Sequence, residues 1–381
     1  MALKNHELNG EAGLPFPLQF VEPEPEPVMA SQPLDIMEKV ARISGRARPT
    51  GARDKILVLH SIDERDVHAE ELVAELAQCG APVYFFHTND FLRLCRLSIE
   101  LDQPYQLSGL LELPTGDLAL EEVKSVWFRG PEIALGDPVD QTGAHAEFVR
   151  RETGAALFGL LGVLDRAFWV NHPDAVQRAE DKLAQLRVAQ SYGLIIPRTL
   201  VTNDPQRLLD FYASCKGEVI LKTFRRLAFY QAGRERLILT NRLRREHLDQ
   251  IERLRHVPCL FQEYVPKEIE LRVTVIGRQV FAAEIHSQRS LVSIDDYRRY
   301  DFARTPYYSH TLPPAVEAAC LQVLQHYGLA FGAIDLIRRP DGAYVFLEIN
   351  ANAQFLWVQD LTGLPMRQAL ADMLIRGSAG E

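Results

Sequence analysis

Residues 346–357 of this chain read FLEINANAQFLW. Its first residues are apolar enough for a buried strand, and this strand carries Glu348, followed two positions later by Asn350. Because residues i and i+2 of an extended chain point to the same side, a carboxylate and a carboxamide are predicted to project together from the strand end. The question is therefore which ligand would need two oxygen donors at the end of this strand.

A second carboxylate precedes it on what reads as the partner strand. The segment LAFGAIDLIRRPDGAYVFLEIN, residues 329–350, has the turn signal PDG at 340–342 between two apolar runs. A hairpin around this turn places Asp335 nearly opposite Glu348. Two carboxylates and an amide oxygen form a hard oxygen site that suits Mg²⁺. A solvent-facing carboxylate pair is the weaker alternative, because unpaired carboxylates are costly beside such apolar runs.

The composition bounds the class of protein. The chain has 381 residues, enough for two or three domains, and it is 47% hydrophobic and 24% charged. A net charge of −9 argues against binding nucleic acid through a basic surface. No apolar run approaches the roughly 20 residues that cross a bilayer, and the N-terminus does not resemble a signal peptide. Five scattered cysteines indicate reduced thiols, no zinc site and a cytoplasmic location.

Strand and helix patterns follow one another along the chain. A strand at 55–61, a helix at 64–78 and a strand at 82–88 predict a parallel α/β unit. The later strands are expected at 123–131, at 217–224, at 236–241 as its hairpin partner, and in a run between 259 and 287. The later helices are expected at 144–164, 174–194 and 314–327.

Basic side chains add candidate phosphate ligands. Lys222 ends the apolar strand VILK, and Lys182 lies on a helix upstream. Arg272 follows Glu270 by two residues, so both side chains are predicted on one strand face. Lysine and arginine hold phosphoryl oxygens, and together with the metal set they predict a nucleotide site, although each alone is more typical of a surface charge. Neither G-x-x-x-x-G-K nor G-x-G-x-x-G occurs. Two H-x-E pairs lack the P-C-x-x-C of zinc deaminases, and no G-x-S-x-G supports a hydrolase.

These segments stand in a collinear order that resembles a known superfamily. The chain resembles the ATP-grasp enzymes, and more narrowly the ATP-grasp maturases of microviridin-type peptides, or graspetides. The segments that carry this resemblance are WVNHP, DKLAQLRVAQSYGL, VILKTF, FQEYVPKEIELRVTVIG, DYRRYD, FGAIDLI and FLEINANAQFLW. The resemblance runs from about residue 54 to 376 and implies an α/β (α+β) fold in three parts. These are a pre-ATP-grasp α/β domain at 54–165, a central lid domain at 166–256 and a C-terminal antiparallel-sheet domain at 257–381, behind an N-terminal extension at 1–53.

The resemblance also implies a reaction with ATP and Mg²⁺. An Asp or Glu side chain of a ribosomally made precursor peptide becomes an acyl phosphate, and a hydroxyl or amine of the same peptide attacks it. The product is a side-chain ester or amide macrocycle. Two alternatives stay open: a ligase that adds amino acids to a protein tail or joins small molecules, and a non-catalytic nucleotide-binding regulator. The resemblance is also compatible with a homodimer.

Site residues are implied at the matching positions. The nucleotide would be held by phosphate lysines, an adenine linker and a ribose-contacting acid, which are Lys182, Lys222, Gln262, Glu263, Val265 and Glu270. Asp335, Glu348 and Asn350 match the magnesium ligands, and Arg272 matches an arginine beside the transferred phosphoryl group. Asp296 and Arg298 are expected to face the acceptor, with a solvated run of charge as the alternative. Two features depart from the common pattern: FRRLAFYQAGRERL replaces a glycine-rich loop, and NANAQ replaces N-P-N-G-Q.

The N-terminal extension contains an isolated apolar motif. LPFPLQFVE, residues 14–22, resembles the leader motif that these maturases recognise on their precursors, although Pro17 argues against a helical bound form. Our hypothesis is that Leu14 to Glu22 is a self-bound leader-like segment that holds the enzyme active or competes with the true leader; a tail without fixed structure is the alternative. A short helix is expected at 34–43.

Arginines cluster despite the negative net charge. Seven of them fall in three groups and would steer a precursor core rich in Asp and Glu, with a solvated helix face as the alternative. They are Arg225, Arg226, Arg242, Arg244, Arg245, Arg298 and Arg299.

Overall fold

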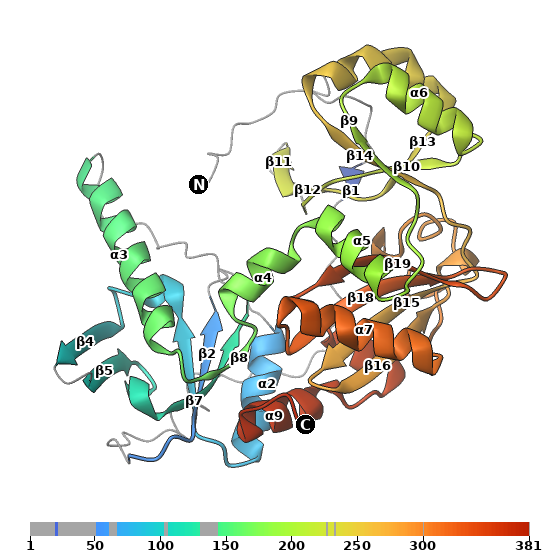
Figure 1. The fold of residues 1–381 in the computed structure, drawn as a ribbon. Helices are drawn as coiled ribbons and strands as arrows, with labels where there is room; N and C mark the ends of the chain where they lie inside the picture. Colours follow the sequence, from blue (N-terminus) through green and yellow to red (C-terminus); the bar gives the residue numbers. More distant parts are fainter. Residues whose placement is uncertain are drawn as a thin grey trace.

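In the computed structural model, the described residues form five β-sheets with helices packed around them (Figure 1). The described residues are 20–21, 51–60, 67–102, 106–129, 144–225, 228–231, 234–299 and 301–380. The helix predicted at 34–43 and residues 14–19 and 22 of the leader-like segment lie outside them. No helix in these ranges is long and apolar enough to cross a membrane.

A four-stranded parallel sheet forms the first layer, in the order β3-β2-β7-β8. Its strands are β2 (Lys55–His60), β3 (Val83–His87), β7 (Val123–Phe128) and β8 (Phe168–Val170). Helix α2 (Val67–Gln78) connects β2 to β3, so the predicted parallel α/β unit is confirmed. Helix α3 (Ala144–Val163) matches the prediction for 144–164. β8 joins this sheet although it follows the predicted boundary at residue 165; the domain boundaries themselves stay predictions.

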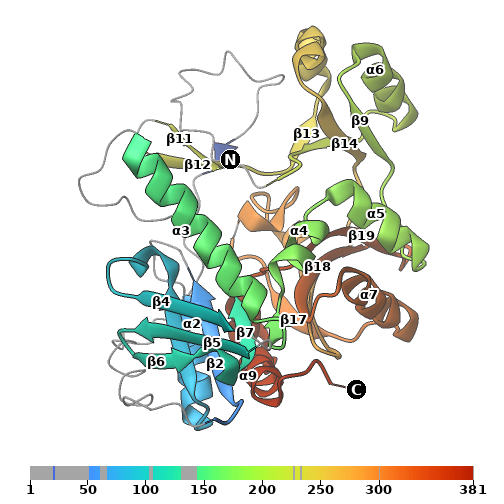
Figure 2. The same ribbon diagram turned by 60° about the vertical axis from the view of Figure 1, so that its left-hand side comes forward.

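A small antiparallel sheet that was not predicted lies between β3 and β7 in the chain. It consists of β4 (Arg96–Asp102), β5 (Gln106–Leu113) and β6 (Gly116–Ala119). Strand β4 is largely exposed, so it lacks the apolar run by which the buried strands are recognised. Figure 2 shows this sheet and α3 in front of the parallel sheet, and Leu111, Leu118 and Leu160 share one core with Leu57.

A second layer contains the predicted lid. Its sheet has the order β13-β10-β14-β9, and α6 (Pro205–Ser214) and the 3₁₀ helix η4 (Arg245–His256) cover its core. The strands are β9 (Thr199–Thr202), β10 (Val219–Lys222), β13 (Asn241–Leu243) and β14 (Cys259–Glu263).

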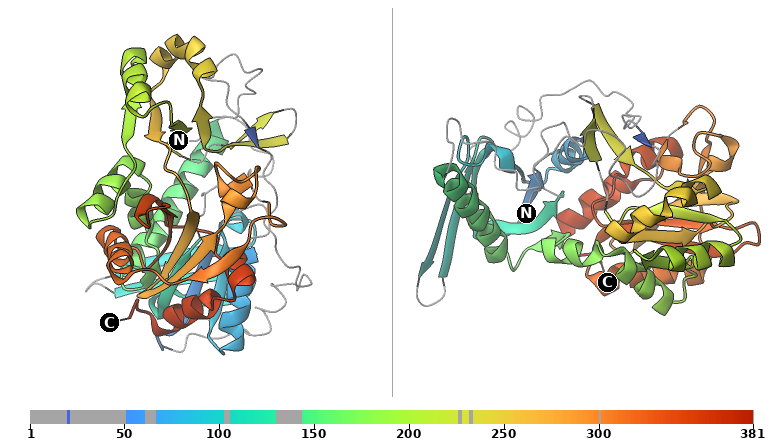
Figure 3. Two further views of the ribbon diagram at one scale, coloured as in Figure 1. Left: turned by 90° about the vertical axis from the view of Figure 1, so that its right-hand side faces the viewer. Right: turned by 90° about the horizontal axis from the view of Figure 1, so that it is seen from above.

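The predicted pairing of 236–241 with 217–224 is wrong. β12 (Arg234–Ile238) pairs with β11 (Ala228–Gln231), and β10 pairs instead with β13. The run breaks between β12 and β13 because the Asn241 side chain donates to the Leu239 carbonyl and the Thr240 N–H donates to Asp296. Figures 1 and 3 show the β11–β12 hairpin between α3 and the lid sheet.

Part of the N-terminal extension is a strand. β1 (Phe20–Val21) pairs antiparallel with β12, with Phe20 opposite Ile238 and Val21 opposite Leu237. The three strands form a sheet of their own, in the order β1-β12-β11. A segment at the start of the chain is therefore attached to a hairpin in its middle.

The third layer is a five-stranded antiparallel sheet, β17-β16-β15-β18-β19. Its strands are β15 (Ile269–Ile276), β16 (Gln279–Ile285), β17 (Tyr307–His310), β18 (Phe331–Arg338) and β19 (Tyr344–Asn350). One face packs on α5 (Lys182–Ser191) and α7 (Pro314–Tyr327), and the other on α8 (Leu356–Thr362) and α9 (Met366–Arg376). The hairpin predicted around 340–342 is confirmed, with Gly342 at φ +84° in its turn.

The single helix predicted at 174–194 is wrong in one respect. The structure has α4 (Pro173–Ala179) and α5, separated at Glu180–Asp181. The Asp181 carboxylate accepts hydrogen bonds from the N–H groups of Leu183 and Ala184, at 2.9 and 3.0 Å, so it caps a new helix. Lys182 thereby becomes the first residue of α5.

Asn171, directly after β8, joins the parallel sheet to the antiparallel one. Its side chain is 1% exposed and makes four hydrogen bonds, with the N–H groups of Ala330 and Phe331 and the carbonyls of Phe331 and Ala351. We expect Asn171→Ala to lower the free energy of unfolding by about 3 kcal/mol or more, because buried backbone groups lose their partner. Urea denaturation measures this; a loss below about 1 kcal/mol would show that the side chain is dispensable.

Candidate active site

Two carboxylates face each other on adjacent strands of the third layer. The register pairs Asp335 of β18 with Glu348 of β19, which confirms the expected opposition, and it pairs Asp335 with Arg272 of β15. A bulge follows Asp335, since Leu336 pairs with Phe346 rather than with Leu347. Both carboxylate residues are 6% exposed, so the alternative of a solvent-facing pair is wrong.

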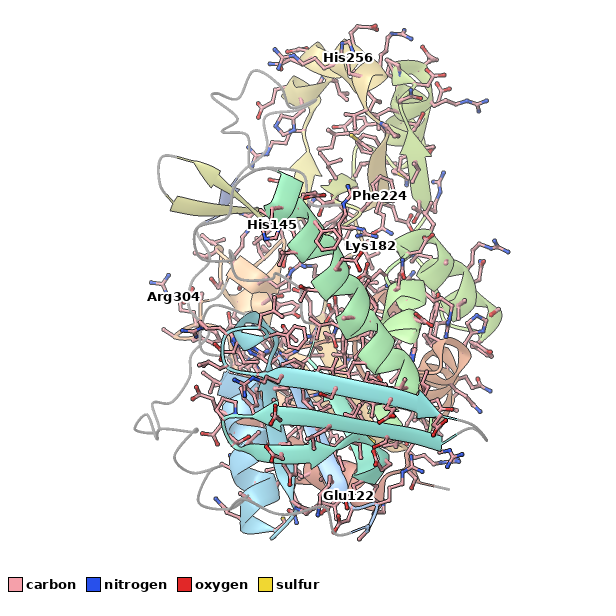
Figure 4. The ribbon with its side chains drawn as sticks, turned by 90° about the vertical axis from the view of Figure 1, so that its left-hand side faces the viewer. Glu122, His145, Lys182, Phe224, His256 and Arg304 are labelled. Atoms are coloured by element: carbon pink, nitrogen blue, oxygen red, sulfur yellow. The ribbon has the colours of Figure 1, made fainter. Side chains whose placement is uncertain are left out.

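Cations from two distant segments of the chain contact Glu348. Lys182 Nζ lies 3.0 Å from Glu348 Oε2 and also donates to the Thr223 carbonyl at 3.0 Å. Arg298 Nη1 lies 3.6 Å from Glu348 Oε1. Figure 4 shows Lys182 beside Phe224, where α5 meets the lid. The Glu348 carboxylate thus contacts side chains that are far apart in sequence.

The ionisation of Glu348 reflects these neighbours. Burial disfavours the charged form, but Lys222, Lys182 and Arg298 outweigh it and hold the pKa of Glu348 well below its usual range. Burial, together with the charges of Lys182 and Arg298, lowers the pKa of Lys222. An excess of positive charge at this place is suited to phosphate groups.

Asp335 is held from three directions. Arg272 Nη1 donates to Asp335 Oδ1 at 2.9 Å, and Tyr297 Oη donates to the same oxygen at 3.3 Å. Asn350 Nδ2 lies 3.4 Å from Asp335 Oδ2, so the third predicted metal ligand adjoins the carboxylate pair. Arg272 Nη2 also approaches the Gln354 carbonyl at 3.5 Å.

Asp296 and Arg298 form a buried pair. Arg298 Nε and Nη2 lie 2.8 and 2.6 Å from the two Asp296 oxygens, and the Thr240 N–H donates to Asp296 at 3.2 Å. Asp296 is 4% exposed, so the alternative of a solvated run of charge is wrong for this carboxylate. Burial opposes its ionisation, but Arg298, the Thr240 N–H and Lys267 hold the pKa of Asp296 well below its usual range.

This low pKa predicts how stability depends on pH. A carboxyl whose pKa is lower in the folded protein stabilises the fold above its unfolded pKa, about 3.9, and this contribution is lost as the pH falls further. We expect Asp296→Asn to cost about 2 kcal/mol at pH 7 and progressively less below about pH 4. Urea denaturation of both proteins between neutral and acid pH measures the difference; a difference that grows toward acid pH would contradict the assignment.

Glu270 lies at the other end of the site. Lys267 Nζ lies 3.1 Å from Glu270 Oε1, and Ser287 Oγ donates to the same oxygen at 2.6 Å. Burial raises the pKa of Glu270, while Lys267 and Ser287 oppose the rise. Next to it, the end of β14 and the residues that follow it place Gln262, Glu263 and Val265. The Gln262 side chain donates to Thr199, and Glu263 accepts from the Arg198 N–H, both at 3.0 Å.

One pocket collects most of the predicted residues. Nine of the twelve line it: Lys222, Gln262, Glu263, Val265, Glu270, Asp296, Arg298, Asp335 and Glu348. The other three contact a carboxylate of its lining: Lys182 through Glu348, and Arg272 and Asn350 through Asp335. The structure therefore brings all twelve together, while their individual roles stay predictions.

Sequence reasoning missed several residues of the pocket. The pocket is also lined by Lys267, Tyr297, Thr240 and Tyr264. Beside it, the guanidinium carbon of Arg242 lies 3.3 Å from the centroid of the Tyr264 ring, and Arg242 forms an ion pair with Asp295. Tyr297 lies between two residues that were predicted, and Lys267 lies three residues before Glu270, so closeness in sequence to a predicted residue was the available signal. Thr240 acts through its backbone, for which no sequence signal exists.

The donor set fits Mg²⁺. Asp335, Glu348 and Asn350 supply oxygen donors at the ends of two paired strands, and the carboxylates are balanced here by lysine and arginine. Oxygen ligands of this kind suit a hard cation that keeps water and binds phosphate. The cations that now contact the carboxylates are also those that phosphate groups would attract.

Comparison with known proteins identifies the fold. Residues 55–177 match the family model described as the MvdD pre-ATP grasp domain. The macrocyclase MdnC of Microcystis aeruginosa MRC, bound with precursor peptide MdnA, is similar with 27% identity and a TM-score of 0.73, covering 84% of this chain and 99% of that one. This chain has the ATP-grasp fold. A RiPP-associated ATP-grasp ligase of Chryseobacterium gregarium, in complex with ADP and a leader and core peptide, is similar with 29% identity and a TM-score of 0.77, covering 85% and 97%.

Curated relatives are more distant. The ribosomal protein bS6--L-glutamate ligase of Salmonella paratyphi B is 23% identical over 226 residues, which is 59% of this chain and 71% of that ligase. The resemblance to ATP-grasp peptide maturases is thus closer than the resemblance to this other ATP-grasp ligase.

Proposed function

We propose that this protein is an ATP-dependent ligase that activates Asp or Glu side chains of a ribosomally made precursor peptide and closes them into ester or amide macrocycles. The observation that carries the proposal is the facing pair Asp335 and Glu348, with Lys182, Arg272 and Arg298 on their oxygens. The likeness to a macrocyclase bound with its precursor peptide supports the choice of substrate.

The chain's own residues position the reactants and balance charge. The peptide carboxylate attacks the terminal phosphorus of ATP, ADP leaves, and the acyl phosphate is then attacked by a hydroxyl or amine that loses a proton as phosphate departs. Lys182, Lys222 and Arg298 would hold phosphate oxygens, and Arg272 would balance the charge that develops on the transferred group. No protein nucleophile is needed, so the catalysis is positioning and electrostatics.

Asp335, Glu348 and Asn350 would hold Mg²⁺, which supplies Lewis-acid polarisation of phosphate oxygens when bound. Gln262, Glu263 and Val265 would contact the adenine, and Glu270 would accept hydrogen bonds from the ribose hydroxyls. Lys267 and Ser287 already hold the Glu270 carboxylate in place.

Mass spectrometry tests the proposal. The purified protein is incubated with ATP, Mg²⁺ and short candidate precursor peptides rich in Asp, Glu and Thr, and we expect a substrate peptide to lose the mass of one water for each ring. A mass gain equal to an added amino acid would favour a tail ligase instead, which the likeness to the glutamate ligase makes the second candidate. Nucleotide binding without turnover of any acceptor would favour a regulator.

The strand β1 supports a role for the leader-like segment Leu14 to Glu22. β12 ends at Ile238, two residues before the pocket residue Thr240, and β11 begins six residues after the pocket residue Lys222. The hairpin with which β1 pairs is thus flanked in the sequence by a pocket residue on each side. An extended segment that adds a strand to such an edge uses its backbone for affinity. We assign the segment the role of an internal leader that holds this hairpin in place.

Two variants test this role. Deletion of residues 1–50 should lower the rate of ring formation on a leaderless core peptide by about tenfold or more, since each 1.4 kcal/mol of lost ordering is a factor of ten. Val21→Pro, which removes a backbone N–H from β1 and restricts its backbone, should act in the same direction, whereas Val21→Ala should not. A faster reaction of the deletion variant on a precursor that carries its leader would show that the segment competes with the true leader. Unchanged activity and unchanged precursor affinity would refute any role.

A further inference from the structure

One acceptor atom of the pocket lining is not used by the protein itself. Among the residues that the structure describes, Gln262 Oε1 is buried and has no hydrogen-bond partner, and the residue as a whole is 2% exposed. A buried acceptor without a partner costs free energy, so this oxygen needs a donor from outside the described chain. Because Gln262 lines the pocket, a ligand bound there can supply that donor.

The strand alternation places the Gln262 side chain on the pocket face of the lid sheet. Phe261, the residue before it on β14, packs into the lid core, so Gln262 points to the opposite face. The register pairs Gln262 with Ile220 of β10 on one side and with Thr199 of β9 on the other, and Figure 1 shows these three strands together in the lid. Ile220 also lines the pocket. The amide therefore lies between a pocket residue and a threonine.

Thr199 determines which end of the amide faces it. The Thr199 hydroxyl donates to the Pro197 carbonyl at 2.9 Å, and this carbonyl can only accept. The single hydroxyl proton is thereby used, so the Thr199 oxygen can only accept from Gln262, whose Nε2 lies 3.0 Å away. The amide nitrogen is held toward Thr199, and the amide oxygen is left for the ligand.

The opposite orientation of the amide is disfavoured as long as the threonine is present. Rotation of the amide by 180° would bring its oxygen to Thr199, and the hydroxyl proton would then have to leave the Pro197 carbonyl. Pro197 is buried, so its carbonyl would lose a partner that water does not readily replace. Such a loss lowers the population of the rotated amide by about ten- to a hundredfold.

The apolar part of the pocket suits a flat heterocycle. Its side chains are those of Pro197, Ile220, Val265, Ile337 and Leu347. The charged lining begins with Lys222, two residues after Ile220 on the same face of β10. A fixed acceptor on this apolar wall favours a base with an amino group, as in adenine, over one with a carbonyl at the same position, as in guanine.

We propose that Thr199 is a positioning residue that fixes the orientation of the Gln262 amide and so makes the pocket select a 6-amino purine nucleotide over a 6-oxo purine nucleotide. Thr199 does not itself line the described pocket, so it acts through Gln262. The inference rests on the function proposed above in one respect, a nucleotide as the occupant of the pocket.

The test compares ADP with inosine diphosphate, which has a carbonyl in place of the adenine amino group. Each is titrated with Mg²⁺ into the full-length protein by calorimetry, and the wild type should prefer ADP by about ten- to a hundredfold. Thr199→Val removes the hydroxyl, so the amide can turn to suit either base and the preference should fall to about threefold or less. Inosine diphosphate should bind this variant more tightly than the wild type, which damage to the fold would not produce.

Matched variants control for the loss of a hydroxyl. Thr199→Ser keeps the hydroxyl and should keep the preference for ADP, and Thr199→Ala removes it a second way if the valine variant does not fold. Thr202→Val removes another hydroxyl of β9, which accepts from the Asp204 N–H at 2.9 Å and lies opposite Cys259, and it should leave the preference unchanged. Gln262→Met should abolish the preference, and adding Thr199→Val should then change it no further, because the two residues act as one unit.

Two results would overturn the inference. One is a wild type that binds both nucleotides within about twofold; the other is an equal loss of affinity for both in Thr199→Val, which would make the threonine merely structural. Binding is read without turnover, so a preference for ADP that depends on Thr199, without ring formation on any peptide, would refute the proposed macrocyclase and support the inference. Ring formation with a preference that does not depend on Thr199 would refute the inference alone.

Discussion

Glu348→Gln is expected to abolish ring formation, with kcat reduced by about a thousandfold or more. The substitution removes a proposed magnesium ligand, and it also removes the negative charge that balances Lys182, Lys222 and Arg298. The excess positive charge would then oppose correct placement of the metal, although it would still attract phosphate. Ring formation followed by mass spectrometry, and ADP release measured in parallel, give the rate.

Glu268→Gln is the matched control for this variant. Glu268 precedes β15 and pairs with Arg338 of β18 at 3.0 and 2.8 Å, outside the pocket. Its rate should stay within about twofold of the wild type, since exposed ion pairs contribute little. If Glu348→Gln retained a tenth of the wild-type rate while Mg²⁺ dependence was unchanged, Glu348 would not be a metal ligand.

Arg272→Lys should lower kcat by about a hundredfold and leave ADP affinity within about threefold. Lysine keeps the positive charge but has no planar fork, so it cannot contact Asp335 and the transferred phosphoryl group at once. The split between kcat and nucleotide affinity separates this role from simple charge balance. Isothermal titration with ADP and Mg²⁺, together with ring formation under saturating ATP, measures both quantities.

Arg338→Lys serves as the control on the same sheet, because Arg338 also pairs with a carboxylate but lies at the exposed end of β18. We expect it to be close to the wild type in both measurements. Should Arg272→Lys weaken ADP binding as much as it slows the reaction, the arginine would be a ground-state nucleotide ligand.

The local residue pattern was sufficient to predict the hairpin formed by β18 and β19. The PDG turn and two apolar runs predict the hairpin of β18 and β19 and place Asp335 close to Glu348. The register next to the turn would pair Asp335 with Leu347, and the bulge after Asp335 shifts it by one residue so that Asp335 faces Glu348, which the sequence pattern does not reveal. By contrast, the break between α4 and α5 was missed, since Asp181 was read as a helical residue rather than as a cap.

Contacts between distant segments could not be read from residue patterns. Lys182 reaches Glu348 from a helix 166 residues upstream, and only the family resemblance brought them into one site. Asn171 and Arg129 bind backbone carbonyls, which every residue has, so nothing in the partner sequence marks the contact. The same holds for the Thr240 N–H on Asp296.

The most direct test of the proposed chemistry follows oxygen atoms. A core peptide with its Glu side-chain carboxylates labelled with heavy oxygen is incubated with the protein, ATP and Mg²⁺, and the released phosphate is analysed by mass spectrometry. Activation as an acyl phosphate predicts one heavy oxygen in the phosphate for each ring closed. Phosphate without label, with rings still formed, would show that the carboxylate is not activated as an acyl phosphate.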